Sequence, residues 1–272
     1  MNRQPEIVVS ASADQLAENA AARLIACLVT ALDERPVAHI VLTGGSILEQ
    51  FMRAVRDLPA RDSVDWARVH VWWGDERYVP TGDDERNDKA AFAALLGSLA
   101  LDPALVHRMP ASDAGFADVE QAARAYAAAL AKAAAPGEAA GPTQAVPPPS
   151  GADIPRFDVA LLGIGPDGHL ASLFPEHPGV YEDAASVIGV RNSPKPPPLR
   201  LSLTFRSFDA ATEVWFIASG QSKAKAVAMA LRGAHRDQVP AAGPSGRLRT
   251  LWLIDRLAAS ELPADLHQPP PT

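Results

Sequence analysis

Short, continuously apolar runs alternate along this chain with longer segments of helical spacing. Such runs are typical of parallel strands that are covered on both faces. They predict strands over residues 7–9, 38–42, 69–73, 157–162, 199–204, 214–218 and 250–254. The alternation of strands with helices favours an α/β fold with a doubly wound, mostly parallel, Rossmann-like sheet flanked by helices. Because such sheets bind ligands at the carboxyl ends of their strands, the residues after each strand are the first candidates for function.

The segments between these strands carry helical signals. Ser12, with Gln15 three residues later, forms a capping box, and apolar residues at helical spacing follow. Further helices are expected over 46–55, 87–99 and 116–135, and from about Ser222 onward.

The length of 272 residues suits one large α/β domain or two small ones, and we expect a single domain over 1–262. A segment rich in Pro, Gly and Ala at about 136–155 has no apolar periodicity. We interpret it as a mobile surface insertion, with a domain linker as the alternative. Residues 263–272 are expected to form a frayed tail.

Charge and composition narrow the class of protein. A net charge of −7 disfavours a nucleic-acid binder but leaves room for a local positive pocket. The single cysteine, Cys27, cannot form an intrachain disulfide and fits a buried apolar position. We see no signal peptide and no apolar run long enough to span a membrane, so a cytoplasmic location is expected. The sequence predicts no particular oligomeric state.

Two glycines and a serine follow the strand at 38–42. Gly44 and Gly45 allow a tight turn and a close approach of the backbone to a ligand. Ser46 and Glu49 have the spacing of a capping box, so we expect a helix to begin here. The start of a helix offers N–H groups and partial positive charge, which suit a phosphate. An ordinary strand-to-helix turn is the alternative.

Three consecutive charged residues follow the strand at 69–73. Arg77 could neutralise an oxyanion or hold a carboxylate, while Asp75 and Glu76 could orient other groups. A loop held by salt bridges is the alternative. Asn87 opens the next predicted helix, where a simple N-cap is the alternative to a functional role.

Gly-Ile-Gly-Pro-Asp-Gly-His, over residues 163–169, follows the strand at 157–162. We expect a helix to begin at this point and its dipole to disfavour a protonated His169. A neutral imidazole can act as a general base near neutral pH, and Asp167 could orient it. A structural or merely exposed histidine is the alternative.

The sequence does not contain the motifs of several other enzyme classes. The chain has no Gly-x-Ser-x-Gly elbow and no Gly-x-x-x-x-Gly-Lys-Ser/Thr loop, which disfavours a serine hydrolase and a P-loop NTPase. The segment 163–168 matches Gly-x-Gly-x-x-Gly, but Glu182 and Asp183 come too early to be the acidic partner of a nucleotide site. The seven histidines form no convincing metal-binding pattern.

Basic residues follow in two segments. Prolines restrict the backbone of residues 193–200, so Lys195 and Arg200 have little conformational freedom. Lys223 stands at the start of a predicted helix, which is mildly unfavourable unless an anion binds there. A solvated surface lysine is the alternative.

Four blocks in order resemble the 6-phosphogluconolactonase family, which shares a superfamily with glucosamine-6-phosphate isomerase/deaminase. They are Thr-Gly-Gly-Ser from 43, Gly-Asp-Glu-Arg-x-Val-Pro from 74, Gly-x-Asp-Gly-His-x-Ala-Ser-Leu-Phe-Pro from 165 and Ser-Gly-x-x-Lys from 219. The resemblance implies a NagB-type fold and hydrolysis of 6-phospho-D-glucono-1,5-lactone to 6-phosphogluconate in the oxidative pentose phosphate pathway. It implies a small sugar-phosphate lactone as the partner, and no metal or organic cofactor.

The resemblance also implies roles for individual residues. His169 would be the general base that activates water, with Asp167 in support, and Arg77 and Lys195 would lie near the lactone. The residues expected to bind the phosphate are Gly44, Gly45, Ser46, Arg200 and Lys223. Asp75 and Asn87 match further substrate-binding positions of the motifs.

One position separates this chain from the isomerase branch. The catalytic glutamate of the isomerases would fall at Phe174, which cannot transfer a proton, and Glu176 is two residues out of register. An amino-sugar phosphate isomerase/deaminase and a non-catalytic sugar-phosphate sensor are the two alternatives to a lactonase.

Overall fold

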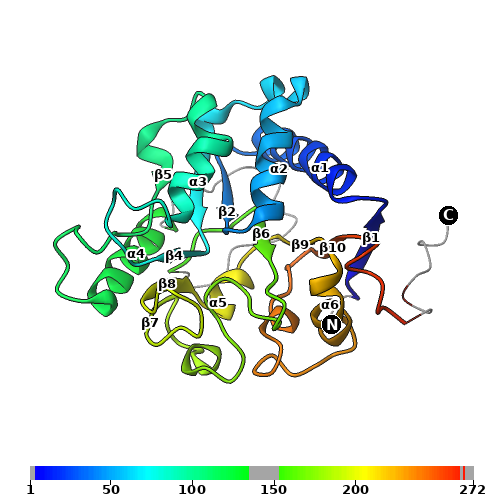
Figure 1. Cartoon of the computed structure of the whole chain (residues 1–272). Helices are drawn as coiled ribbons and strands as arrows, with labels where there is room; N and C mark the ends of the chain where they lie inside the picture. Colours follow the sequence, from blue (N-terminus) through cyan, green and yellow to red (C-terminus); the bar gives the residue numbers. More distant parts are fainter. Residues whose placement is uncertain (1–3, 135–152, 264–265, 267–272) are drawn as a thin grey trace.

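A computed structural model of the chain describes residues 4–134, 153–263 and 266. At its centre is a seven-stranded sheet in the order β1-β10-β9-β6-β2-β3-β5, with parallel pairing throughout (Figure 1). Its strands are β1 (Glu6–Ser10), β2 (Ala38–Leu42), β3 (Val69–Trp73), β5 (Val106–His107), β6 (Val159–Gly163), β9 (Glu213–Ala218) and β10 (Arg249–Asp255). The predicted fold class, a mostly parallel α/β sheet flanked by helices, is confirmed.

The strand order reverses between β2 and β6. From β2 the chain continues outward to β3 and β5, then returns to the other side of β2 with β6, and continues to β9 and β10. At such a switch point the connections leave the sheet in opposite directions and open a crevice at the carboxyl ends of the two strands. The segments after β2 and β6 therefore lie where this type of sheet accommodates a ligand.

Helices cover both faces of the sheet. Figure 1 shows α1 and α2 on its upper side and α5 and α6 on its lower side. The α-helices are α1 (Ala13–Glu34), α2 (Ser46–Asp57), α3 (Asn87–Ala94), α4 (Val119–Ala133), α5 (Phe205–Phe208) and α6 (Ala224–Leu231). Short 3-10 turns occur at Pro59–Ser63, Trp66–Arg68, Leu96–Ser98, Pro103–Leu105, Pro178–Tyr181, Gln221–Lys223 and Pro240–Ala242. The burial pattern of β2, β3 and β9 is continuous, because both of their faces are covered.

A second, three-stranded sheet lies beside the carboxyl edge of β3. It consists of β4 (Asp75–Arg77), β8 (Arg200–Leu203) and β7 (Val187–Val190), paired antiparallel in the order β4-β8-β7. The strand predicted over 199–204 therefore exists, but outside the parallel sheet. Its pairing places Arg77 directly opposite Arg200, and this brings two distant basic residues together.

The helices predicted from Ser12, 46 and 87 begin within one residue of α1, α2 and α3, but of their predicted caps only that at Ser12 exists. The Ser12 cap is confirmed, since its Oγ accepts from the N–H of Gln15 at 3.2 Å. The helix predicted over 87–99 ends earlier, at Ala94, because Leu95 leaves the helical region with φ −145°.

The predicted insertion at about 136–155 falls mostly outside the described residues, and so does most of the predicted tail at 263–272. The extent of the single domain stays a prediction. Among the described residues, no helix is both long and apolar enough to cross a membrane.

Candidate active site

A cavity of about 380 Å³ opens at the carboxyl edge of the parallel sheet, at the switch point between β2 and β6. All of the site residues predicted from the sequence line it except Asp167, which contacts two that do. The predicted residues in its wall are Gly44, Gly45, Ser46, Asp75, Arg77, Asn87, His169, Lys195, Arg200 and Lys223. Segments that are far apart in the sequence thus converge on one hollow.

The turn between β2 and α2 forms one wall. Gly45 is the N-cap of α2 with φ +130°, a backbone conformation that favours glycine, and no side chain caps the helix among the described residues. The predicted capping box of Ser46 and Glu49 is therefore wrong, because Ser46 is already the first helical residue. The missing side-chain cap favours an anion site, because it leaves the first N–H groups of α2 without a side-chain acceptor beside the cavity.

Asn87 packs closely against this turn. A Cβ atom on Gly44 would lie 2.0 Å from Asn87 Oδ1, so only glycine leaves room for the amide. The amide Nδ2 donates to the backbone oxygen of Asp75 at 3.0 Å and to Asp75 Oδ1 at 3.3 Å. The N-cap interpretation of Asn87 is wrong, because Arg86 occupies the cap and Asn87 is the first residue of α3.

Asp75 links three segments of the wall. Its Oδ2 accepts from Ser172 Oγ at 2.8 Å, and its Oδ1 faces Asn87, while only 5% of the residue is exposed. The strand β4, the start of α3 and the loop after β6 are thereby joined through one carboxylate. Ser172 was missed from the sequence, although it stands in the Ala-Ser-Leu-Phe-Pro block that follows His169.

No helix begins at His169, contrary to the sequence prediction. Residues 164–173 form tight turns, with Gly168 N–H donating to the Gly165 oxygen at 3.0 Å and Gly165 N–H to the His169 oxygen at 2.9 Å. Gly168 has φ +82°, which breaks any helical path. The predicted helix dipole is therefore absent at His169, and the groups that contact the ring set its orientation instead.

Those neighbours are Asp167 and Lys195. His169 Nδ1 lies 2.5 Å from Asp167 Oδ1 and 3.1 Å from Lys195 Nζ. Because Nδ1 faces both groups, Nε2 is the ring nitrogen that remains for a ligand in the cavity. The ring of Phe174 packs against the imidazole with 4.8 Å between centroids and fixes its plane from one side.

Gly165 makes this arrangement possible. A Cβ atom there would lie 1.8 Å from His169 Nδ1 and 2.4 Å from Asp167 Oδ1. Both side chains therefore lie over the bare backbone of Gly165, and the glycine is required by space at this position.

The cavity is strongly basic although the whole chain is acidic. Arg77, Lys195, Arg200 and Lys223 line it. Burial, together with the charge of Lys195, lowers the pKa of Lys223, and the carboxylate of Asp167 partly opposes this. Desolvation likewise lowers the pKa of Arg200. An anion in the cavity would relieve both effects.

Asp167 remains a carboxylate well into the acid range. Desolvation by itself would raise its pKa, but the hydrogen bond with His169 and the charges of His169 and Lys195 outweigh it and hold the pKa well below the ordinary value. The Asp167 charge is thus available to orient the imidazole over the whole physiological range.

Arg77 and Arg200 use their guanidinium groups differently. Arg200 donates to the backbone oxygens of Pro196 at 2.7 Å and of Pro197 at 3.2 Å, so it also holds the segment that carries Lys195. Arg77 donates from Nη1 to the Glu85 oxygen at 2.5 Å, and its buried Nε has no partner among the described residues.

Gln50 and Ser219 also line the cavity and were not predicted. Gln50 lies four residues after Ser46, on the same face of α2, so helical spacing could have found it. Ser219 opens the Ser-Gly-x-x-Lys block, and its Oγ donates to Asp255 Oδ2 at 2.6 Å. Among the described residues, no group of three or more His, Cys, Asp or Glu side chains is arranged to hold a metal ion.

The fold and the cavity together define a doubly wound α/β protein with a pocket lined by basic residues at its topological switch point. A sequence model of the family described as glucosamine-6-phosphate isomerases/6-phosphogluconolactonase matches residues 11–252. The chain belongs to this family, and the resemblance seen in the sequence is confirmed.

Relatives of known name lie within the same family. A 6-phosphogluconolactonase of Streptomyces coelicolor is 52% identical over 270 residues, which cover 99% of each chain. A 6-phosphogluconolactonase of Mycobacterium tuberculosis is 45% identical over 95% of this chain and 98% of its own. The solved structure of 6-phosphogluconolactonase from Trypanosoma brucei superimposes with a TM-score of 0.77 at 25% identity, covering 97% of this chain and 100% of that one.

Proposed function

We propose that this chain hydrolyses 6-phospho-D-glucono-1,5-lactone to 6-phospho-D-gluconate, a step of the oxidative pentose phosphate pathway. Relatives that carry the name 6-phosphogluconolactonase match nearly the whole chain, which supports the enzyme class. The observation that carries the proposal is the pairing of His169 Nδ1 with Asp167 at 2.5 Å in a cavity lined by basic residues. A cytoplasmic location is part of the proposal.

In the proposed reaction His169 acts as the general base. The carboxylate of Asp167 accepts from Nδ1–H, which leaves the lone pair of Nε2 directed to the cavity. Nε2 removes a proton from water while the water oxygen forms a bond to the lactone carbonyl carbon. The C–O bond to the ring oxygen then breaks, and protonated Nε2 returns the proton to the leaving oxygen. The product carboxylic acid ionises in water.

Basic residues would stabilise the charge that develops on the carbonyl oxygen. Arg77 lines the cavity, its buried Nε has no partner in the described part of the chain, and Lys195 Nζ lies 3.1 Å from His169 Nδ1. Donors that are fixed before the reaction stabilise an oxyanion strongly, because they do not need to reorganise. We assign both residues to this task. The route uses only side chains and water, so it requires no metal or organic cofactor.

The phosphate would bind at the start of α2. In the described part of the chain no side chain caps the N–H groups that follow Gly44, and Lys223 and Arg200 add positive charge in the same cavity. These are the features that a phosphate monoester requires. Asp75 and Asn87 would shape the wall between this end and the lactone, since they are bonded to each other.

The test is a lactonase assay with freshly generated lactone, corrected for spontaneous hydrolysis. We expect rapid turnover by the parent enzyme and no release of ammonia from glucosamine 6-phosphate, because buried Phe174 occupies the position of the isomerase acid. A parent rate equal to spontaneous hydrolysis, with sugar-phosphate binding intact, would instead indicate a non-catalytic sensor.

A further inference from the structure

Glu76 is a completely buried carboxylate between two residues that line the cavity. It lies in β4 between Asp75 and Arg77 and is 0% exposed. It is not among the residues that line the cavity. Burial of a charged group is costly unless hydrogen bonds compensate it, so the contacts of this carboxylate indicate what it holds together.

Three backbone N–H groups donate to Glu76, from two different elements. Oε1 accepts from the N–H of Arg77 at 2.8 Å and of Asn87 at 2.7 Å, and Oε2 accepts from Asp88 at 2.9 Å. Asn87 and Asp88 are the first two residues of α3, whose N-cap provides no side-chain hydrogen bond. Glu76 thus caps α3 from a neighbouring strand, because it accepts from the first two N–H groups of the helix.

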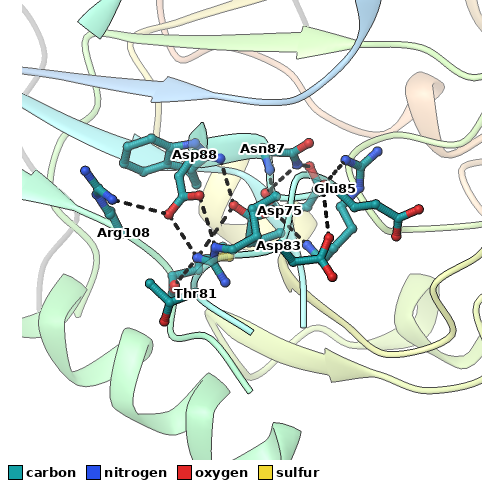
Figure 2. Close-up of polar contacts among 12 residues, drawn as sticks. Asp75, Thr81, Asp83, Glu85, Asn87, Asp88 and Arg108 are labelled. Carbon is teal, nitrogen blue, oxygen red and sulfur yellow. Dashed lines mark hydrogen bonds and ion pairs between the residues drawn. The ribbon is translucent and has the colours of Figure 1, made fainter. Parts of the chain in front are cut away.

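The cationic neighbour of Glu76 is already engaged elsewhere. Arg86 Nη2 is 3.7 Å from Glu76 Oε2, but the same guanidinium makes two bonds of 3.0 Å to Asp88 and one of 2.8 Å to the Met109 oxygen. Figure 2 shows Asp88 beside Asn87, with Arg108 approaching Asp88 from the other side. The three backbone N–H donors, more than an ion pair with Arg86, therefore compensate the burial of the Glu76 carboxylate.

The two elements that Glu76 joins both carry cavity residues. Asn87, whose N–H it binds, places its amide between Gly44 and Asp75. Arg77, whose N–H it also binds, extends its side chain toward the cavity and donates to the Glu85 oxygen in the loop before α3. A shift of β4 relative to α3 would move Arg77 away from its place at the cavity.

We propose that Glu76 is a positioning residue for the hydrolysis: by tying β4 to the start of α3, it sets the position of Arg77 in the cavity. This inference rests on the proposed function, because Arg77 is there assigned to the oxyanion. Glu76 itself does not contact the substrate. An amide at this position keeps the size but turns one acceptor into a donor that faces a backbone N–H, so Glu76→Gln loosens the connection without opening a void.

The experiment compares Glu76→Gln with Glu213→Gln in the full chain. Glu213 is a matched control, since it is also a buried carboxylate, 7% exposed, that accepts from Trp215 Nε1 and Arg249. It is the first residue of β9 and so lies at the amino edge of the sheet, opposite the cavity. Both variants are assayed well below their melting temperatures. We expect Glu76→Gln to lower kcat by about 10- to 100-fold with little change in KM, as small displacements of catalytic groups do. Glu213→Gln is expected to keep the parent kcat.

A double-mutant cycle separates positioning from a general loss of stability. In an Arg77→Ala background, Glu76→Gln is expected to lower kcat by a clearly smaller factor than in the parent, because the group that it positions is gone. Equal factors in both backgrounds, or a Glu76→Gln variant as active as Glu213→Gln, overturn the inference while the parent remains a lactonase. A parent without lactonase activity overturns the proposed function and this inference with it.

Discussion

His169 and Asp167 meet at 2.5 Å between Nδ1 and Oδ1, and both lie over Gly165 at the carboxyl edge of β6. The contact engages one ring nitrogen and leaves the other for water. Its geometry depends on a backbone without a side chain beneath it, on Lys195 beside it and on Phe174 behind it. This small cluster is the part of the molecule on which the proposed chemistry depends.

Gly165→Ala should displace the imidazole. The new methyl group would lie 1.8 Å from His169 Nδ1, so the ring must move. We expect kcat to fall by about 100-fold or more, with a much smaller change in KM, because the phosphate end of the cavity is untouched. Steady-state kinetics of the variant measure this. Gly82→Ala is the control, since a Cβ atom at Gly82 meets nothing within 4 Å. Full activity of Gly165→Ala would show that the ring position is unimportant.

Asp167→Asn should impair turnover without weakening the fold at neutral pH. The amide can no longer accept from Nδ1–H as a carboxylate does and can hold the ring in the wrong tautomer. We expect kcat to fall by roughly 10²–10⁴-fold at pH 7.5, as in other enzymes in which a carboxylate orients a catalytic histidine. Because the pKa of Asp167 is held well below its ordinary value, the defect should have the same size from pH 6 to 8. A loss confined to one end of this range would contradict the assignment.

Lys223→Gln should weaken binding more than chemistry. Lys223 is a half-buried cation in the cavity, and a hydrogen bond between charged groups contributes about 1.5–3 kcal/mol, or roughly 10- to 100-fold in affinity. We therefore expect KM to rise by that factor, and the effect to shrink at high salt. Lys225→Gln is the control, since Lys225 lies two residues further on, in α6, is exposed and lines no part of this cavity. If Lys223→Gln lowers kcat and leaves KM unchanged, Lys223 acts at the lactone end of the cavity and not on the phosphate.

Glu76 should make stability depend on pH. Burial raises the pKa of Glu76 from 4.5 to about 7, against the opposing effects of its backbone donors and Arg86. Tyr126 and Arg200 are further titratable groups whose charges couple to it. A raised pKa means that the carboxyl group stabilises the fold most below about pH 4.5, and that this contribution is lost as the pH rises through 7.

The comparison of the parent with Glu76→Gln isolates this effect. The stability advantage of the parent over the variant should shrink between pH 5 and pH 8 by an amount on the order of 1–3 kcal/mol. Denaturant unfolding of both proteins at the two pH values measures it. A gap that stays constant, or widens toward pH 8, would mean that the carboxyl group ionises normally inside the fold.

The sequence predicted six of the seven strands of the parallel sheet, because each is short, apolar and bounded by turn residues; the two-residue β5 was missed. The strands predicted over 38–42 and 69–73 coincide with β2 and β3. The rule that ligands bind at the carboxyl ends of such strands also predicts much of the candidate site from the sequence alone. The strand order explains why these residues lie close together, since β2 and β6 are neighbours that flank the switch point.

Among the features that the sequence did not reveal, two have different physical reasons. The segment after β6 was expected to be helical, but Pro166, Asp167 and Gly168 favour turns, and short-range turn hydrogen bonds prevail there. The strand β4 consists of three charged residues and resembles a loop. Only its pairing with β8, more than a hundred residues away in the sequence, and the distant donors of Glu76 define it. No local pattern carries that information.

The His169→Ala variant tests most directly whether His169 supplies the base. With freshly generated 6-phospho-D-glucono-1,5-lactone and correction for spontaneous hydrolysis, we expect kcat to fall by about 10²–10⁴-fold while affinity for 6-phosphogluconate stays close to that of the parent. A variant that retains the parent kcat but no longer binds the sugar phosphate would contradict the account.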